Sequence, residues 1–192
     1  AFKANPDRGV YKSTDGGNTW QKILYKSDKV GFSDLVLLPG NPETVFATAW
    51  KAERKPWTII SGGTNEEGGI YKSVNGGTTW TRLSEGLPKG LIGKIDLAIP
   101  KVDTKVVYAL VEAPDEEGGV YKSTNQGQSF KQVSNEGGLR TRPFYYTNIE
   151  VDPNNPDKVY VLATGYYRSD DGGKEWMRIS SPHGDNHDMW IN

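Results

Sequence analysis

The chain has 192 residues, with 23 lysines and arginines against 24 aspartates and glutamates and a net charge of -1. This balance gives no basic excess for binding nucleic acid, and no apolar run approaches the ~20 residues of a membrane span. Cysteine is absent, which excludes disulfides, thiolate metal sites and cysteine nucleophiles. The 23 glycines, together with 6 Trp, 10 Tyr and 5 Phe, favour short strands and tight turns over helices.

The first element along the chain is a hairpin whose turn pattern recurs four times. Each copy carries a Ser, then an Asp or Asn, then a Gly, and closes on an aromatic residue. The Asp or Asn can bond backbone amides in the turn, and the Gly can adopt a positive φ, so the pattern predicts a structural turn. The copies are Ser13, Asp15, Gly17 and Trp20; Ser73, Asn75, Gly77 and Trp80; Ser123, Asn125, Gly127 and Phe130; and Ser169, Asp171, Gly173 and Trp176.

Two further strands are predicted between successive hairpins. They are residues 34–38 with 44–48, 96–100 with 106–110, and 148–152 with 158–162. Each repeat therefore holds four short antiparallel strands, and the hairpins recur after 60, 50 and 46 residues. This organisation predicts an all-β protein, a β-propeller built of four-stranded antiparallel blades.

The repeats divide the chain into one propeller segment. We expect a partial blade at 1–30, blades at 31–86, 92–135 and 145–181, and an orphan first strand at 188–192. The favoured interpretation is a piece of a larger propeller, forming an incomplete ring. Alternatively, the last strand closes the ring onto the N-terminal strands, or two chains complete one ring by self-association through exposed blade edges.

Three loops are predicted on the channel face, where propellers usually bind ligands. They are residues 51–63, 138–146 and 183–188. The first two combine arginines with aromatic rings, which suits stacking on sugar rings or clamping a carboxylate. In the alternative, Phe144 and Tyr145 plug the core and the arginines are solvated. The candidate ligand-binding residues are Arg54, Trp57, Arg140, Arg142, Tyr145, Tyr146, His183 and His187.

The third loop contains both histidines of the chain. A divalent cation near His183, Asp185 and His187 is one possibility, and acid–base chemistry is another. The spacing matches no closed zinc site, however, so a hydrogen-bonded turn leading into a strand is the competing explanation.

Aligned repeats place Asp34, Asp96, Asn148 and Asp188 in one register at the start of the first strand. Such clustering can raise the pKa of one acid or hold a cation. In the simpler alternative, each side chain bonds the amides of the preceding loop. The candidate catalytic residues are Asp185 and Asp188, with Asp34 or Asp96 opposite.

The turn pattern, Ser-x-Asp-x-Gly-x-Thr-Trp, resembles the Asp-box or BNR repeat of sialidases, sortilin-type domains and xyloglucan-cleaving propeller glycosidases. Stretches 54–63, 142–146 and 183–191 look like a bacterial group of sortilin-like BNR-repeat proteins labelled glycosyl hydrolases. The resemblance implies a secreted or periplasmic propeller. For its function we expect a recognition module that binds a carbohydrate or protein ligand on the channel face and requires no cofactor. The alternative is a glycoside hydrolase with paired carboxylates, or a fragment of one.

Overall fold

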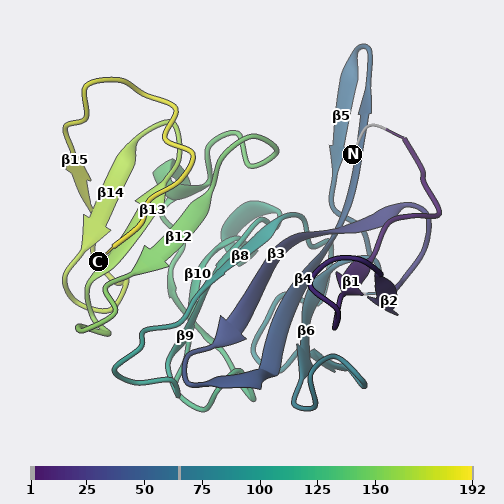
Figure 1. Cartoon of the computed structure of the whole chain (residues 1–192). Coiled ribbons are helices and arrows are strands. Elements are labelled where there is room, and N and C mark those ends of the chain that lie inside the picture. The colour runs from purple at the N-terminus through teal and green to yellow at the C-terminus, as the bar shows by residue number, and fades with distance from the viewer. Residues whose placement is uncertain (1–2, 65, 192) are drawn as a thin grey trace.

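The computed structural model describes residues 3–64 and 66–191, which form four antiparallel sheets arranged like blades of a fan (Figure 1). The sheets follow chain order, and within each four-stranded sheet the strands are hydrogen-bonded in sequence order. The strands are β1 (Val10–Lys12) and β2 (Gln21–Leu24); β3 (Val30–Leu38), β4 (Asn41–Lys55), β6 (Gly69–Ser73) and β7 (Thr81–Leu83); β8 (Ile95–Ala98), β9 (Val107–Val111), β10 (Gly119–Ser123) and β11 (Lys131–Ser134); and β12 (Asn148–Val151), β13 (Val159–Leu162), β14 (Tyr166–Ser169) and β15 (Met177–Ile179).

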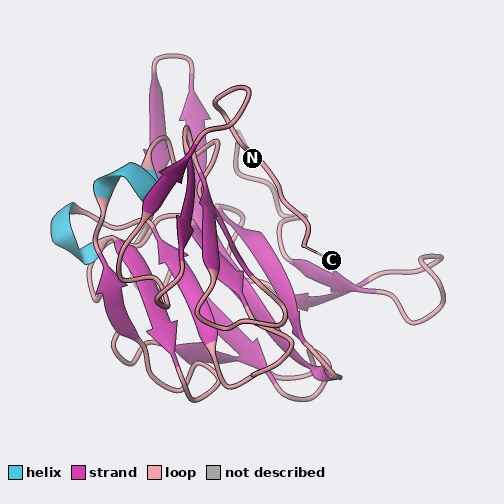
Figure 2. Cartoon of the chain, turned by 90° about the vertical axis from the view of Figure 1, so that its left-hand side faces the viewer, coloured by secondary structure: helices cyan, strands magenta, loops and turns pink. Residues whose placement is uncertain are grey.

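Helical structure in the described residues is limited to two 3-10 turns, η1 (Asp115–Glu117) and η2 (Gly137–Arg140) (Figure 2). This agrees with the glycine-interrupted sequence, in which no window sustains a helical period. In the part of the chain that the structure describes, no helix is long and apolar enough to cross a membrane.

The hydrophobic core lies between consecutive sheets rather than within one shared centre. Phe46, Ile70 and Val107 belong to a cluster between the second and third sheets, while Tyr108, Ile149 and Val161 belong to one between the third and fourth. A smaller cluster joins the first and second sheets. Alternate residues of each strand face opposite neighbours, so a middle strand such as β9 is buried on both sides.

The four recurring turns share one hydrogen-bond pattern. The Ser Oγ accepts from the Gly N–H at 2.8 Å in the first copy and 2.9 Å in the others. The Asp or Asn Oδ1 accepts from the amide four residues later, and each closing Trp donates Nε1–H to the Gly carbonyl at 3.0 Å. The predicted positive φ of the glycines is confirmed: Gly17, Gly77, Gly127 and Gly173 have φ between 82 and 92°.

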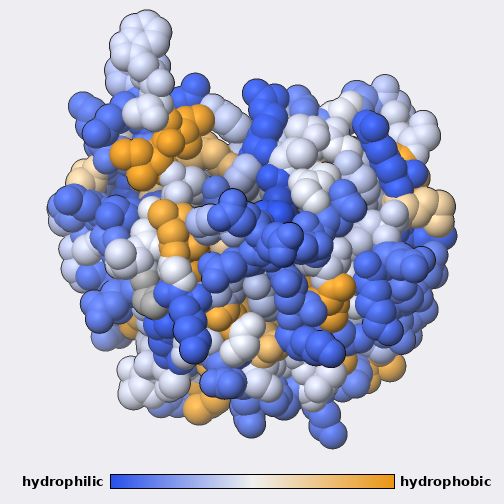
Figure 3. All heavy atoms as spheres, turned by 180° about the vertical axis from the view of Figure 1, so that it is seen from behind, coloured by the Kyte–Doolittle hydropathy of each residue, from blue (hydrophilic) through white to orange (hydrophobic). Residues whose placement is uncertain are grey.

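A long hairpin projects from the second sheet. The end of β4 pairs with β5 (Thr58–Ser61), from Ala52 opposite Ser61 to Lys55 opposite Thr58. Seen from behind, the end of this hairpin rises above a mostly hydrophilic surface (Figure 3). Trp57 lies at its tip and is 97% exposed.

The last segment departs from the expected first strand at 188–192. Residues 188–191 form no strand, and Asn192 lies outside the described residues. The segment nevertheless runs beside β12, because Asn148 Nδ2 donates to the His187 carbonyl at 2.6 Å. One side-chain bond replaces the ladder of backbone bonds that would define a strand.

Candidate functional site

Two of the predicted aspartates join neighbouring sheets at the free edges of the innermost strands. Asp34 on β3 accepts from the Leu97 N–H of β8 through Oδ2 at 2.8 Å. Asp96 on β8 repeats this contact with the Ile149 N–H of β12, also at 2.8 Å. The first strand of each sheet is paired on one side only, so the amides on its unpaired edge need an acceptor from outside the sheet. The simpler sequence interpretation, in which these side chains bond the amides of the preceding loop, is therefore wrong for Asp34 and Asp96, because both accept from amides of the next sheet.

Burial of these carboxyl groups changes their acidity. Burial raises the pKa of Asp96 to about 7, and the charge of Asp34 adds to that effect. Burial also raises the pKa of Asp34, against the opposing hydrogen bonds from two backbone amides. Lys94 lies close to both, and its own pKa is lowered by burial while the neighbouring carboxylates oppose that change. The site therefore retains protons at a pH where ordinary carboxylic acids are ionised.

Glu150 belongs to this cluster but is not among the residues expected from the sequence. It lies on β12, where burial, followed by the charges of Asp188 and Asp34, raises its pKa to about 7. No hydrogen bond to its carboxyl group is found within residues 3–64 and 66–191. The sequence did contain a signal for Glu150: the aligned positions in the other two repeats are the apolar Val36 and Ala98, so a glutamate here is an exception to the repeat.

The C-terminal loop supplies Asp188 next to Glu150. Asp188 is exposed and accepts from the Met189 N–H at 2.8 Å. His183 is also exposed, and its Nδ1 lies 2.7 Å from the Gly184 carbonyl oxygen. The possible divalent cation near His183, Asp185 and His187 is not supported, because no three His, Asp or Glu side chains in the described residues are placed to hold a metal ion.

A row of aromatic rings runs from Trp50 on β4 through residues 144–146 of the loop before β12. The ring centroids of Trp50 and Phe144 are 5.2 Å apart, those of Phe144 and Tyr145 5.4 Å, and those of Tyr145 and Tyr146 6.2 Å. The row ends at His187, whose ring lies 4.8 Å from Tyr146. Tyr146 is buried and Tyr145 is 38% exposed, so the loop both anchors itself and presents rings to solvent.

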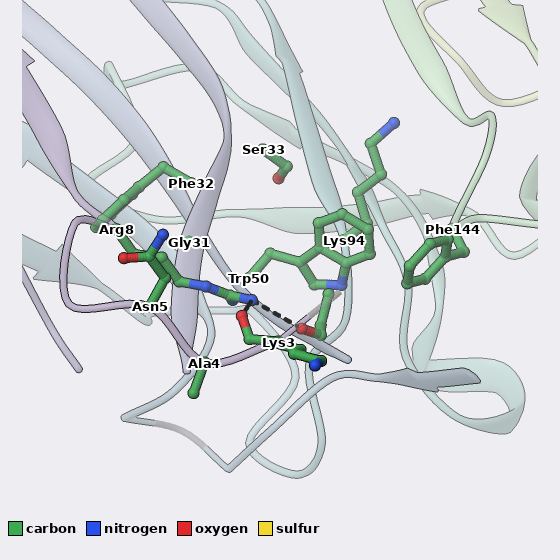
Figure 4. A pocket seen from close by; sticks show the side chains of 11 residues that line it. Lys3, Ala4, Asn5, Arg8, Gly31, Phe32, Ser33, Trp50, Lys94 and Phe144 are labelled. Atoms are coloured by element: carbon green, nitrogen blue, oxygen red, sulfur yellow. Dashed lines mark hydrogen bonds between the residues drawn. The ribbon is translucent and has the colours of Figure 1, made fainter. Parts of the chain in front are cut away.

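Lys94 connects the aromatic row to the carboxyl cluster. Its Nζ donates to the Tyr146 carbonyl and to Asn148 Oδ1, each at 2.9 Å. Lys94, Trp50 and Phe144 also line a cavity of about 700 Å³ that reaches Ser33 and Arg8 (Figure 4). Figure 4 shows the Trp50 indole turned toward the Phe144 ring. The two groups of residues therefore form one continuous surface.

The four predicted arginine and tryptophan positions are used in different ways. Arg54 and Arg142 lie over the Tyr145 ring, at 5.4 and 5.7 Å from its centroid. Arg140 instead donates to the backbone carbonyls of residues 113, 115 and 135, each at 3.3 Å, and so holds its own loop. Trp57 stands apart at the hairpin tip.

The structure thus brings together two sets of the predicted residues. The first set is Asp34, Asp96 and Asp188, whose charges interact with that of Glu150. The second set is in contact through the rings of Tyr145 and Tyr146, and consists of Arg54, Arg142, Tyr145, Tyr146, Asp185 and His187. The separated residues are Arg140, Trp57 and His183.

The chain is similar in sequence to two bacterial xyloglucanases. It is 32% identical over 183 residues to a xyloglucanase of Paenibacillus sp, covering 91% of this chain and 15% of the relative. It is 25% identical over 206 residues to the xyloglucanase Xgh74A of Acetivibrio thermocellus, covering 89% of this chain and 22% of the relative. The chain therefore spans less than a quarter of the length of these curated relatives. No protein-family model matches it.

Solved structures identify the fold. The GH74 enzyme of Niastella koreensis superposes with a TM-score of 0.65 at 19% identity, over 92% of this chain and 27% of that one. A YCF48 structure with a bound D1 peptide superposes with a TM-score of 0.51 at 15% identity, over 81% of this chain and 41% of that one. The fold is a β-propeller. The predicted fold class is confirmed, and since this fold hosts both enzymes and binding proteins, function has to be argued from the site.

Proposed function

We propose that this chain is part of a β-propeller glycoside hydrolase that cleaves a polysaccharide lying across the channel face. The observation that carries the proposal is Glu150, a largely buried carboxyl group on β12 whose pKa is raised to about 7 by burial and by the nearby charge of Asp188. Similarity to two xyloglucanases supports the same reaction class.

Glycoside hydrolysis needs two carboxyl groups in different protonation states. One donates a proton to the leaving oxygen, and the other acts as general base or nucleophile at the anomeric carbon. With a pKa of about 7, roughly half of the Glu150 side chains carry a proton at neutral pH, which suits the acid. We assign Asp188 as its partner, because it is exposed and adds to the field at Glu150. Asp34 and Asp96 hold the sheets in register and supply the surrounding charge.

The aromatic row gives the polysaccharide a place to lie. Sugar rings present apolar faces that pack on aromatic side chains, and the row offers the half-buried Trp50 and Phe144 and the exposed Tyr145 for such contacts. Because Lys94 ties this loop to β12 through Asn148, the sugar-binding surface and Glu150 have a fixed spacing.

The test is release of reducing ends from xyloglucan, galactan and polygalacturonate by the 192-residue chain, with Glu150→Gln as the variant. Loss of a general acid is expected to reduce the rate by about 10²- to 10⁴-fold. Lys131→Gln, on the outer strand β11, is the matched control and should retain the rate. Absence of cleavage of all three polymers, or an unchanged rate in Glu150→Gln, would contradict the proposal.

A recognition module for a glycan or protein is the second candidate. It is favoured by the commitment of both Asp34 and Asp96 to backbone amides, which leaves fewer carboxyl groups free for chemistry. Binding of a polymer without cleavage in the same assay would select this candidate.

We assign the four hairpins as Asp-box repeats, supported by their shared bonds, and the sheets as the partial blade and blades expected at 1–30, 31–86, 92–135 and 145–181. A polysaccharide is too large to enter a cell, so action outside the cytoplasm follows from the proposed substrate. Self-association through free sheet edges stays a prediction.

A further inference from the structure

Two guanidinium groups converge on one exposed tyrosine ring. Arg54 reaches Tyr145 from the projecting hairpin, and its Nη1 donates to the Tyr145 hydroxyl, whereas Arg142 approaches the same ring from the neighbouring loop. Arg142 also lies 5.9 Å from the centroid of Tyr146. Elements 91 residues apart in sequence are thus brought together at a single positively charged point.

The backbone around this point is strained. Arg142 has a φ of 54°, Thr147 a φ of 71° and Asp185 a φ of 60°, and all three flank Tyr146. The left-handed region is unfavourable for non-glycine residues, and a β-branched residue such as Thr147 is least suited to it. Strain of this kind tends to gather where a side chain must be presented to a ligand.

The nearby acidic groups do not neutralise the two arginines. Glu53 lies 3.8 Å from Lys55, and Glu112 accepts from Ser61 Oγ and from the Lys94 N–H. Asp185 interacts with the hydroxyl of Tyr146, which raises the pKa of that tyrosine. Within residues 3–64 and 66–191, neither Arg54 nor Arg142 forms an ion pair.

We propose that Arg54 and Arg142 form a subsite for the carboxylate of a uronic acid unit. The carboxylate lies beside Tyr145 and accepts hydrogen bonds from both guanidinium groups, which also relieves their mutual repulsion. The inference rests on the proposed function and narrows its substrate to an acidic polysaccharide. Exposed guanidinium groups suit this role, because a carboxylate can accept charge-assisted hydrogen bonds from both at once.

The test compares two trisaccharides that differ only in charge. Isothermal titration calorimetry at about 50 mM salt measures the affinity for an α-1,4-linked galacturonic acid trimer and for its carboxyl-reduced galactose trimer. We expect the acidic trimer to bind at least about tenfold more tightly. Arg54→Gln and Arg142→Gln should each bring the two affinities to within about threefold, and Lys131→Gln should leave the ratio unchanged. Thermal melts of each variant establish that the fold is intact.

The outcomes separate this subsite from the proposed hydrolysis. Equal affinities for the two trimers, or a preference that survives both arginine substitutions, would overturn the subsite even if polysaccharide is cleaved. A charge preference that depends on Arg54 and Arg142 would support the subsite even if no polymer is cleaved, and the hydrolase assignment would then be the part that failed.

Discussion

Replacing Asp96 by alanine is expected to lower the free energy of unfolding by about 2 to 3 kcal/mol at pH near 5. The Ile149 N–H on the inner edge of β12 would lose its acceptor, and a buried donor without a partner carries its full desolvation cost. The third and fourth sheets would also lose a direct connection between their first strands. Urea denaturation followed by tryptophan fluorescence measures the change.

Asp96→Asn is the matched control for this prediction. The amide oxygen keeps an acceptor for the Ile149 N–H, so the loss should stay below about 1 kcal/mol. Similar losses in the two variants would contradict this prediction, because asparagine keeps both the size of Asp96 and an acceptor for the Ile149 N–H.

Stability is expected to decrease as the pH rises from about 5 to about 8, by an amount on the order of 2 to 4 kcal/mol. Asp96 and Glu150 both have a pKa of about 7 in the folded chain, above the 3.8 and 4.5 of the free groups. The folded chain therefore holds these protons more tightly than the unfolded chain. The resulting stabilisation is complete below about pH 4 and is lost as the pH passes through 7. Glu150 is in partial contact with water, so solvent screening reduces its contribution to the change in stability.

The variants that test this pH dependence remove the titrating groups. Glu150→Gln should roughly halve the change between the two pH values, and Asp96→Asn combined with Glu150→Gln should reduce it further, to the share that comes from the raised pKa of Asp34. The measurements run from about pH 5 to about pH 8 to avoid the region below about pH 4. There, hydrogen bonds in the turns lower the pKa of Asp15 and Asp171, so these two groups make stability fall as the pH decreases. A denaturation midpoint that does not change with pH in the unmodified chain would contradict the account.

The fold could be predicted from the sequence because its information is local. A turn such as 73–80 contains its own hydrogen-bond acceptor, its own positive-φ glycine and its own tryptophan donor, so eight residues determine its shape. Repetition of such turns at similar intervals then leaves a bladed all-β architecture as the consistent solution.

The site was less predictable because its contacts cross between repeats. The acceptor role of Asp34 depends on Leu97, which is 63 residues away, and nothing near Asp34 in the sequence indicates that partner. The acidity of Glu150 likewise arises from burial and from the charges of Asp188 and Asp34. The sequence also could not distinguish Arg140 from Arg142. Arg140 bonds backbone carbonyls, whereas Arg142 lies over the Tyr145 ring.

The most direct test of the account is the pKa of Glu150 itself. A ¹³C NMR titration of the side-chain carboxyl carbon, assigned by comparison with Glu150→Gln, follows this one group. We predict a midpoint at a pH of about 7, well above the 4.5 of a free glutamate. A midpoint close to 4.5 would mean that the group is ionised at neutral pH, and Glu150 would then not be the proton donor of this site.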